Sequence, residues 1–206
     1  VEMRFLLGDQ EMFRQLQIQL RKKLFKDTAG EFTEAKLAER DARHLKQGGQ
    51  RYMVEPNVKE GKGGLRDLQS LYWIEKYING VFHAEQLVEA GVFSAEEFAT
   101  FEAAQNFLWA VRCHLHLIAN RAMDQLTFEL QVEVAEAIGY RDRGGRRAVE
   151  HFMQAYFRHA TKVGELTRIF LTALEAAQVK KEPVLLRVLR RKPKLKLGFC
   201  VLQNRL

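Results

Sequence analysis

The sequence predicts an all-α protein, a multi-helix bundle, and three observations support this prediction. Apolar residues recur at intervals of three and four along most of the chain, which is the spacing of a helix with one buried face. Proline is rare, with 3 in 206 residues, so long helices are seldom interrupted. No Ser/Gly/Pro-rich stretch divides the middle of the chain, which favours short connections. At 47% hydrophobic residues, the chain can bury a substantial core as one domain or two small ones.

Two helices are predicted before residue 48. The first follows Gly8-Asp9, where Asp9 is placed to cap free backbone amides. Its apolar positions come at helical steps: Phe13, Leu16, Leu20 and Leu24. The second runs from about Phe32 to Lys46 and is so rich in charge that only a narrow face can be buried. Gly48-Gly49 is expected to end it.

A short strand-turn insert is predicted next. Residues 51–54, "RYMV", are β-prone, and Pro56 breaks that run. A basic, glycine-dense stretch, "VKEGKGGLRD" (58–67), then passes directly into a third helix that ends at Asn79-Gly80. The apolar face of this helix consists of Leu65, Leu68, Leu71, Ile74 and Ile78.

The second half of the chain predicts three more helices. Ser94 and Glu97 form a capping box ahead of the longest, which runs to about Ile118. The next carries Leu126, Leu130, Val134 and Ala137 and closes at Gly139. "RDRGGRR" is a loop, and a final long helix extends from about Val149 to Leu174. We therefore expect a helical domain over residues 1–180 and a basic, extended C-terminal tail, a linker, over 181–206.

Charge and cysteine usage restrict the class of protein. The net charge is +7, from 33 Lys+Arg against 26 Asp+Glu, which suits a protein that handles anions but speaks against a dedicated nucleic-acid packer. Cys113 and Cys200 lack any CxxC or Cys/His spacing, so they are expected to be free thiols in a reducing compartment. No apolar run is long enough to span a bilayer, and no signal peptide opens the chain. We expect a cytoplasmic protein, and the chain ends suggest a piece of something longer.

The glycine-dense turn is the main candidate site. Gly63-Gly64 at a helix start would let backbone amides approach a ligand, and Lys59, Lys62 and Arg66 add positive charge. These five residues make a candidate phosphate cradle. The alternative is that the glycines only turn the chain and the basic side chains are solvated, and spacing alone does not decide between the two. The stretch is neither a Walker loop nor a dinucleotide fingerprint.

Other polar clusters carry weaker signals. Arg112, Arg121 and Asp124 are predicted to form a structural polar network between helices. His114 and His116 stand two apart on a helix and face different directions, so no metal site is predicted. The tail cluster favours a solvated linker over a nucleic-acid site because no aromatic residues interleave its charges: Arg187, Arg190, Arg191, Lys192, Lys194 and Lys196. The motifs of common hydrolases and two-metal phosphoryl-transfer sites are absent, so we assign no catalytic residue.

The segment "EPNVKEGKGGLRDLQSLYWI" closely resembles the region that follows the nucleotidyltransferase core in bacterial protein-PII uridylyltransferases. Its Lys59–Leu68 part is also similar to a "KxGxGGIREI" element of glutamine-synthetase adenylyltransferases. Further stretches fit the uridylyltransferases in the same order, so the likeness covers most of the chain: "RFLLGDQEMFRQL", "AKLAERDARH", "FLWAVRCHLHLIANRAMDQLTFELQ" and "AVEHFMQAYFRHATKVGELTRIFL".

This resemblance implies the central helical region of a larger enzyme. The family combines a nucleotidyltransferase domain, this region, a metal-dependent HD domain and two ACT domains, and it transfers UMP from UTP to a tyrosine of the PII signal protein. Mg²⁺ and UTP would belong to the core, which is absent here, so the fragment alone is expected to be inactive and to hold no metal. The expected partners are PII and the adjacent nucleotidyltransferase and HD domains. The backbone amides of the glycine turn, Lys59 and Arg66 would lie near the UTP phosphates.

Two alternatives remain open. The chain could be a fragment of a glutamine-synthetase adenylyltransferase, although "EPNVKEGKGGLRD" and the tryptophan of "LYWI" favour the uridylyltransferases. It could also be a stand-alone basic helical module that binds nucleic acid, which would show a steep salt dependence.

Overall fold

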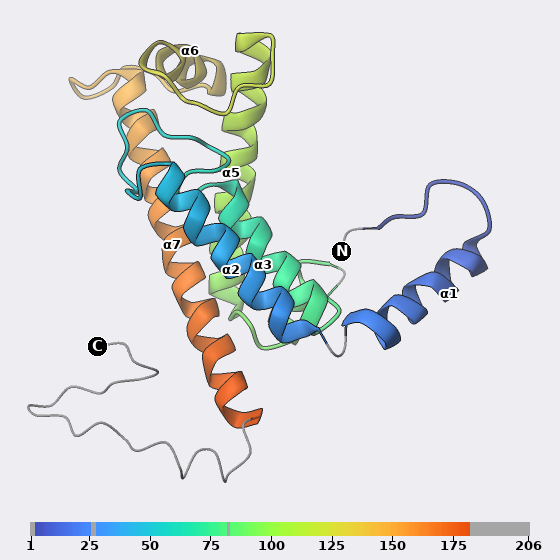
Figure 1. Ribbon diagram of the computed structural model, residues 1–206. Coiled ribbons are helices and arrows are strands. Elements are labelled where there is room, and N and C mark those ends of the chain that lie inside the picture. Colours follow the sequence, from blue (N-terminus) through green and yellow to red (C-terminus); the bar gives the residue numbers. More distant parts are fainter. Residues whose placement is uncertain (1–2, 26–27, 82, 182–206) are drawn as a thin grey trace, which may run out of the picture. The chain divides into compact units, whose positions relative to one another are not determined.

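The computed structural model describes residues 3–25, 28–81 and 83–181, with side chains as far as residue 174 (Figure 1). The described residues form helices and turns without a strand, so the predicted all-α fold is confirmed. In chain order the elements are α1 (Gln10–Leu20), a π-helical turn η1 (Arg21–Phe25), α2 (Ala29–Lys46), α3 (Leu65–Ile78), α4 (Gln86–Glu89), α5 (Ala95–Ala119), α6 (Phe128–Ile138) and α7 (Ala148–Lys181). None of these helices combines the length and apolar content needed to cross a membrane.

The chain divides into two compact units, residues 1–170 and residues 171–206, and the boundary between them falls within the residue range of α7. The packing below concerns the first unit. The predicted boundary between residues 180 and 181 stays a prediction. The basic tail predicted from residue 181 falls, from residue 182 on, outside the described residues.

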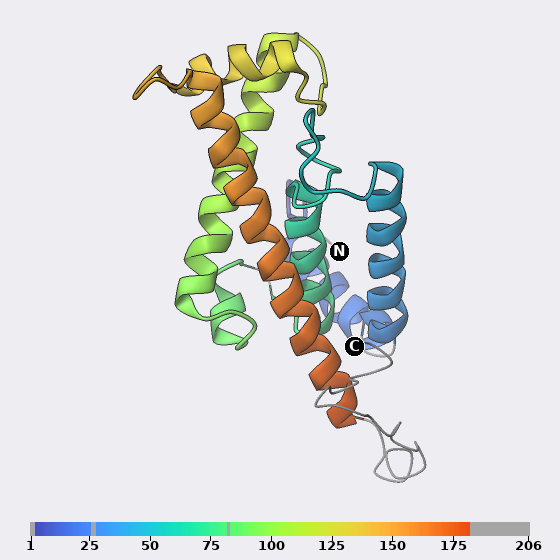
Figure 2. The ribbon, with the colours of Figure 1, turned by 90° about the vertical axis from the view of Figure 1, so that its left-hand side faces the viewer.

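Helices α2, α3 and α5 pack in that order, and α4 and α6 also pack on α5. Aromatic rings join α7 to α5, since the Phe107 ring lies 6.3 Å from that of Phe152 and 4.3 Å from that of His159. Figures 1 and 2 show α6 at the end of the bundle where α5 ends and α7 begins. The predicted apolar faces supply the buried core: Leu68, Leu71, Ile74, Phe101, Leu108, Val111, Leu115, Phe152, Val163 and Phe170.

The predicted helix ends agree with the local hydrogen bonding. Asp9 caps α1, because its Oδ1 accepts the amides of Glu11 at 2.8 Å and Met12 at 3.1 Å. Ser94 and Glu97 form both bonds of the capping box that starts α5. Gly139 ends α6 with φ +106, a left-handed conformation that glycine adopts without a side-chain clash.

Three features differ from the pattern-based expectation. The apolar face of α1 reaches no core, since none of its residues is buried. Helix α2 begins at Ala29, three residues before the predicted start. Helix α4 was not predicted, because four residues, 86–89, are too short to show a helical period.

The predicted strand at residues 51–54 does not form. The insert contributes only an isolated antiparallel bridge between Asn57 and Gln125. A β-prone segment needs a neighbouring strand to take up its backbone groups, and this one lies among helices. Tyr52 instead contacts α7, with its ring 5.6 Å from that of Phe157 and its hydroxyl 3.1 Å from Thr161 Oγ1.

Glu75 on α3 is a buried carboxyl whose effect on stability can be tested by substitution. Burial raises the pKa of Glu75, and the hydrogen bond from Asn79 opposes that shift. Because the pKa of Glu75 is higher in the folded protein than in the unfolded chain, folding is favoured when the carboxyl is protonated, below the unfolded-state pKa. Stability is lost as pH rises through the folded-state pKa. We expect Glu75→Gln to be more stable than the parent at pH 7 and equally stable at pH 4. Urea unfolding at both pH values measures this, and a stability loss at pH 7 would contradict it.

Candidate functional site: the glycine turn and its two carboxylates

The glycine-dense turn is closed by hydrogen bonds from its own amides to the Asn57 side chain and to backbone carbonyls. Asn57 Oδ1 accepts the amides of Lys59 and Glu60, at 3.2 and 2.7 Å. The amide of Gly64 donates to the carbonyl of Gly61, and that of Arg66 donates to the carbonyl of Lys59, both at 2.9 Å. These amides are therefore already satisfied within the protein.

The glycines of the turn allow close packing of backbone on backbone. Gly63 is buried with φ +84, and a Cβ added there would lie 2.5 Å from the carbonyl oxygen of Ala160 on α7. A Cβ at Gly64 would lie 2.7 Å from the carbonyl oxygen of Val58. Only glycine fits either position without displacing main chain. The missing side chains of Gly63 and Gly64 thus leave room for the protein's own main chain.

Asp67 is the first of two aspartates that organise the turn. It is 3% exposed and accepts hydrogen bonds from the Gly63 amide at 2.8 Å, from Arg43 Nη2 at 2.5 Å and from His44 Nε2 at 2.9 Å. Burial by itself would raise the pKa of Asp67, but the His44 hydrogen bond and charge, the Gly63 amide and Arg43 together lower it. Asp67 therefore ties α2, the turn and α3 together as an ionised group.

Arg43 keeps N–H donors that form no hydrogen bond within the described residues. Its side chain is 9% exposed, and Nε and Nη1 are buried without a hydrogen-bond partner among the described residues. Glu60 Oε2 lies 3.6 Å from Nε. Arg43 thus lies between the buried Asp67 and the more exposed Glu60, with its charge shared between them.

Glu60 gathers the basic side chains that the sequence singles out. Arg66 Nη2 lies 3.3 Å and Lys59 Nζ lies 3.5 Å from Glu60 Oε1. The Arg66 guanidinium also stacks over the Trp73 ring at 5.2 Å. The structure therefore brings Lys59 and Arg66 together on one face. Lys62 is exposed on the turn and takes part in none of these contacts.

Asp124 is the second aspartate beside the turn. It accepts a hydrogen bond from Arg112 Nε at 2.7 Å and lies 3.2 Å from His116 Nε2. Burial would raise the pKa of Asp124, but the bonds from Arg112 and His116 and the charge of Lys59 lower it. Lys59 Nζ lies 3.9 Å from Asp124 Oδ2, so one lysine links the two clusters that the sequence keeps apart. Arg121, predicted to join Arg112 and Asp124, is exposed and makes no recorded polar contact within the described residues.

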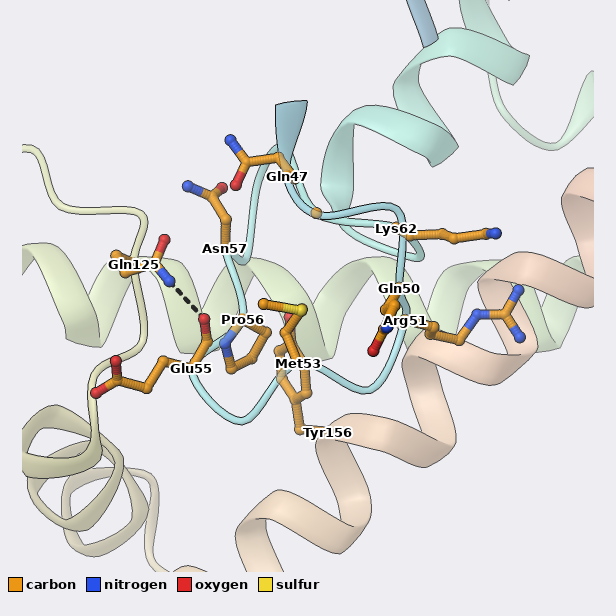
Figure 3. Close-up of a pocket in the computed structure, with 11 residues that line it drawn as sticks. Gln47, Gln50, Arg51, Met53, Glu55, Pro56, Asn57, Lys62, Gln125 and Tyr156 are labelled. Carbon is orange, nitrogen blue, oxygen red and sulfur yellow. Dashed lines mark hydrogen bonds between the residues drawn. The ribbon is translucent and has the colours of Figure 1, made fainter. Parts of the chain in front are cut away.

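The loop that carries Asp124 is joined to the insert along its length. The Val58 amide donates to the Asp124 carbonyl at 2.8 Å, and the Leu126 amide donates to the Pro56 carbonyl at 2.9 Å. Gln125 Nε2 donates to the Glu55 carbonyl, the bond drawn in Figure 3. These bonds explain why an insert without strands still has a defined path.

A small pocket lies beside the turn, between the insert, Gln125 and Tyr156 of α7 (Figure 3). Its volume is about 40 Å³, enough for a few water molecules and far too little for a nucleotide. Among the described residues, no group of three or more His, Cys, Asp or Glu side chains could hold a metal ion. A nucleotide that approached this turn would lie outside the pocket, on the face around Lys59, Lys62 and Arg66.

Sequence reasoning missed the residues that α2 contributes. Arg43 and His44 belong to a helix whose charge density predicted a mostly solvated surface, and nothing in its spacing marks them. Asp67, an isolated acid in the sequence, has its partners 23 and 24 residues earlier. The only local signal was the short distance from Asp67 to Gly63, one helical turn.

Comparison with known proteins identifies the family. The model of the family described as GlnD PII-uridylyltransferase matches residues 31–171. The whole chain is 62% identical to a bifunctional uridylyltransferase/uridylyl-removing enzyme of Ruegeria pomeroyi and 57% identical to one of Cereibacter sphaeroides. It spans 23% and 22% of the length of these two relatives. No solved structure matches it. The chain therefore belongs to the GlnD PII-uridylyltransferase family.

Proposed function

We propose that this chain is the central helical region of a PII-uridylyltransferase and that it supports transfer of UMP from UTP to a tyrosine of the PII protein. The family match and the small share of its relatives' length that the chain spans support this assignment. UTP and Mg²⁺ would be bound mainly by a nucleotidyltransferase core outside this chain. That core, an HD domain and PII would be the partners.

The observation that carries the proposal is the fixed placement of Lys59 and Arg66 on one face. Lys59 belongs to the turn and Arg66 to the first turn of α3, and the buried Asp67 joins the turn, α2 and α3. The amides of Gly63 and Gly64 donate to Asp67 and Gly61, so the proposal assigns phosphate contact to basic side chains and a shaping role to the glycines. Lys62, exposed on the same turn, adds a third cation.

Such side chains would act by electrostatic stabilisation. Phosphoryl and nucleotidyl transfer develops negative charge on the phosphates and the leaving pyrophosphate, and preorganised cations lower the energy of that state. Glu60 holds Arg66 and Lys59 at 3.3 and 3.5 Å, which limits their freedom before a ligand arrives. A phosphate would compete with Glu60 for these donors.

Arg66→Ala in the full-length enzyme tests the proposal. Loss of one charge-assisted hydrogen bond to phosphate removes about 1.5–3 kcal/mol. We therefore expect uridylyl transfer at subsaturating UTP to fall by roughly 10- to 100-fold. Uridylyl removal should change far less, because that reaction belongs to another domain, and the melting temperature should hold.

Arg40→Ala is the matched control. Arg40 is also a partly buried arginine, and it pairs with Asp41 on α2 at 2.8 Å. Its loss should leave both activities near those of the parent. Parallel losses of both activities in Arg66→Ala, with a lower melting temperature, would instead mean that Arg66 only scaffolds the domain.

A further inference from the structure

The connection between α6 and α7, residues 139–147, forms a tight hairpin rich in arginine, here called the arginine hairpin. Arg143 and Arg146 pair in antiparallel fashion, with amide-to-carbonyl bonds of 3.0 and 3.2 Å in the two directions. Gly144 and Gly145 at the tip have φ +60 and +75, which is the two-residue turn that hairpins prefer. The turn therefore holds two arginines side by side at a defined spacing.

The arginines of this hairpin lack acidic partners. Arg141, Arg143, Arg146 and Arg147 are all exposed, and no guanidinium of the four forms a salt bridge within the described residues. The backbone amide of Arg147 donates to Glu150 Oε2 at 2.9 Å. The one acid of the hairpin, Asp142, is occupied, since its Oδ1 accepts the Ala148 amide at 2.7 Å where α7 begins. Four guanidinium groups thus face solvent without a salt bridge among the described residues. Three of them, with His151, line an open hollow.

We propose that the arginine hairpin is a docking surface for an acidic protein segment, whose carboxylates pair with Arg143 and Arg146. Opposite residues that exchange both backbone bonds in an antiparallel pair have Cα atoms about 5.5 Å apart, which suits neighbouring carboxylates on one partner strand or helix. Arginine presents a planar fork that matches a carboxylate through two parallel bonds. Figure 2 shows the hairpin projecting from the end of the bundle.

The neighbouring surface of α6 favours a protein over a nucleic acid. Glu129, Glu133 and Glu136 are exposed on this helix, so a phosphate backbone that ran from the hairpin onto α6 would meet like charge, whereas a protein segment can keep its carboxylates at the hairpin. Phe128 and Val132 are 60% and 45% exposed beside them. Arginine and aromatic side chains with a rim of mixed charge are typical of protein–protein interfaces.

Nuclear magnetic resonance of the 206-residue chain tests this proposal. The probe is acetyl-tetraglutamate-amide, a peptide short enough to meet the hairpin alone. We expect saturable shifts of the arginine Nε–H signals of Arg143 and Arg146. Affinity should drop at least tenfold in Arg143→Ser/Arg146→Ser. Lys22→Ser/Lys23→Ser, which removes the same charge from exposed residues of η1, should bind like the parent.

Two further arms can overturn the proposal. Gly144→Ala/Gly145→Ala keeps every charge but strains the tip, where an added Cβ meets no neighbour, so weaker peptide binding would support a preformed surface. Unchanged binding in that variant would mean that the peptide responds to charge alone and that the shape of the hairpin does not contribute. An oligouridylate of equal charge that binds through the same arginines more tightly than the peptide would assign the surface to nucleic acid instead. Equal weakening by the η1 control would also overturn it.

Discussion

Asp67→Asn is expected to lower the free energy of unfolding by about 3–5 kcal/mol at pH 7. Asparagine keeps the size of the side chain but removes the charge that faces Arg43, whose side chain is 9% exposed. It also gives up one of the two acceptor oxygens that serve the Gly63 amide, Arg43 and His44. Breaking one half of a buried ion pair leaves the other half desolvated and unpaired, which is the reason for the large effect.

The pH dependence of this difference has a defined sign. The pKa of Asp67 is lowered in the folded protein from an ordinary value of 3.8. Its contribution is therefore fully present above that value and is lost as pH falls through the lower folded value. The stability gap between parent and Asp67→Asn should be constant near neutrality and should shrink below pH 3.8.

Asp41→Asn is the control for Asp67→Asn. Asp41 belongs to α2, its side chain is 62% exposed, and it pairs with Arg40 at the surface. The same substitution there should change stability by about 0.5 kcal/mol or less. Urea unfolding of the three proteins measures both values. Losses of equal size at Asp67 and Asp41 would show that the buried carboxylate does not organise the turn.

Gly63→Ala is expected to destabilise the protein by about 3–4 kcal/mol, from two sources. An alanine at φ +84 pays the penalty of the left-handed conformation, about 1–2 kcal/mol. Its Cβ would also lie 2.5 Å from the Ala160 carbonyl oxygen and 3.0 Å from the carbonyl carbon. These atoms are helix main chain and cannot rotate away, so α7 and the turn must separate.

Gly49→Ala isolates the conformational part. Gly49 has φ +69, and an added Cβ there has no neighbour within 4 Å. Its loss should be about 1–2 kcal/mol, from the left-handed conformation alone. The difference between the two variants, measured by urea unfolding, reports the close approach of the turn to α7. Equal losses would mean that this approach contributes nothing to stability.

The sequence by itself determined the elements that depend on local physics. Apolar spacing located the main helices, and the caps at Asp9, Ser94 and Gly139 depend on bonds within a few residues of each other. The family resemblance likewise rested on a contiguous stretch around Gly63-Gly64. Such features need no knowledge of distant partners, so they can be predicted from the order of residues.

Only the tertiary structure decided which groups accept the amide hydrogen bonds of the glycine turn and which atoms fill the space beside its glycines. The Gly63 amide donates to Asp67, and the backbone of Ala160, 97 residues further along the chain, fills the space beside Gly63. Arg43 and His44 meet Asp67 because α2 packs on α3, a contact that no spacing within α2 encodes. The strand expected at residues 51–54 fails for the same reason, since β-structure depends on which neighbour is present. Contacts between distant segments set the partners of buried polar groups.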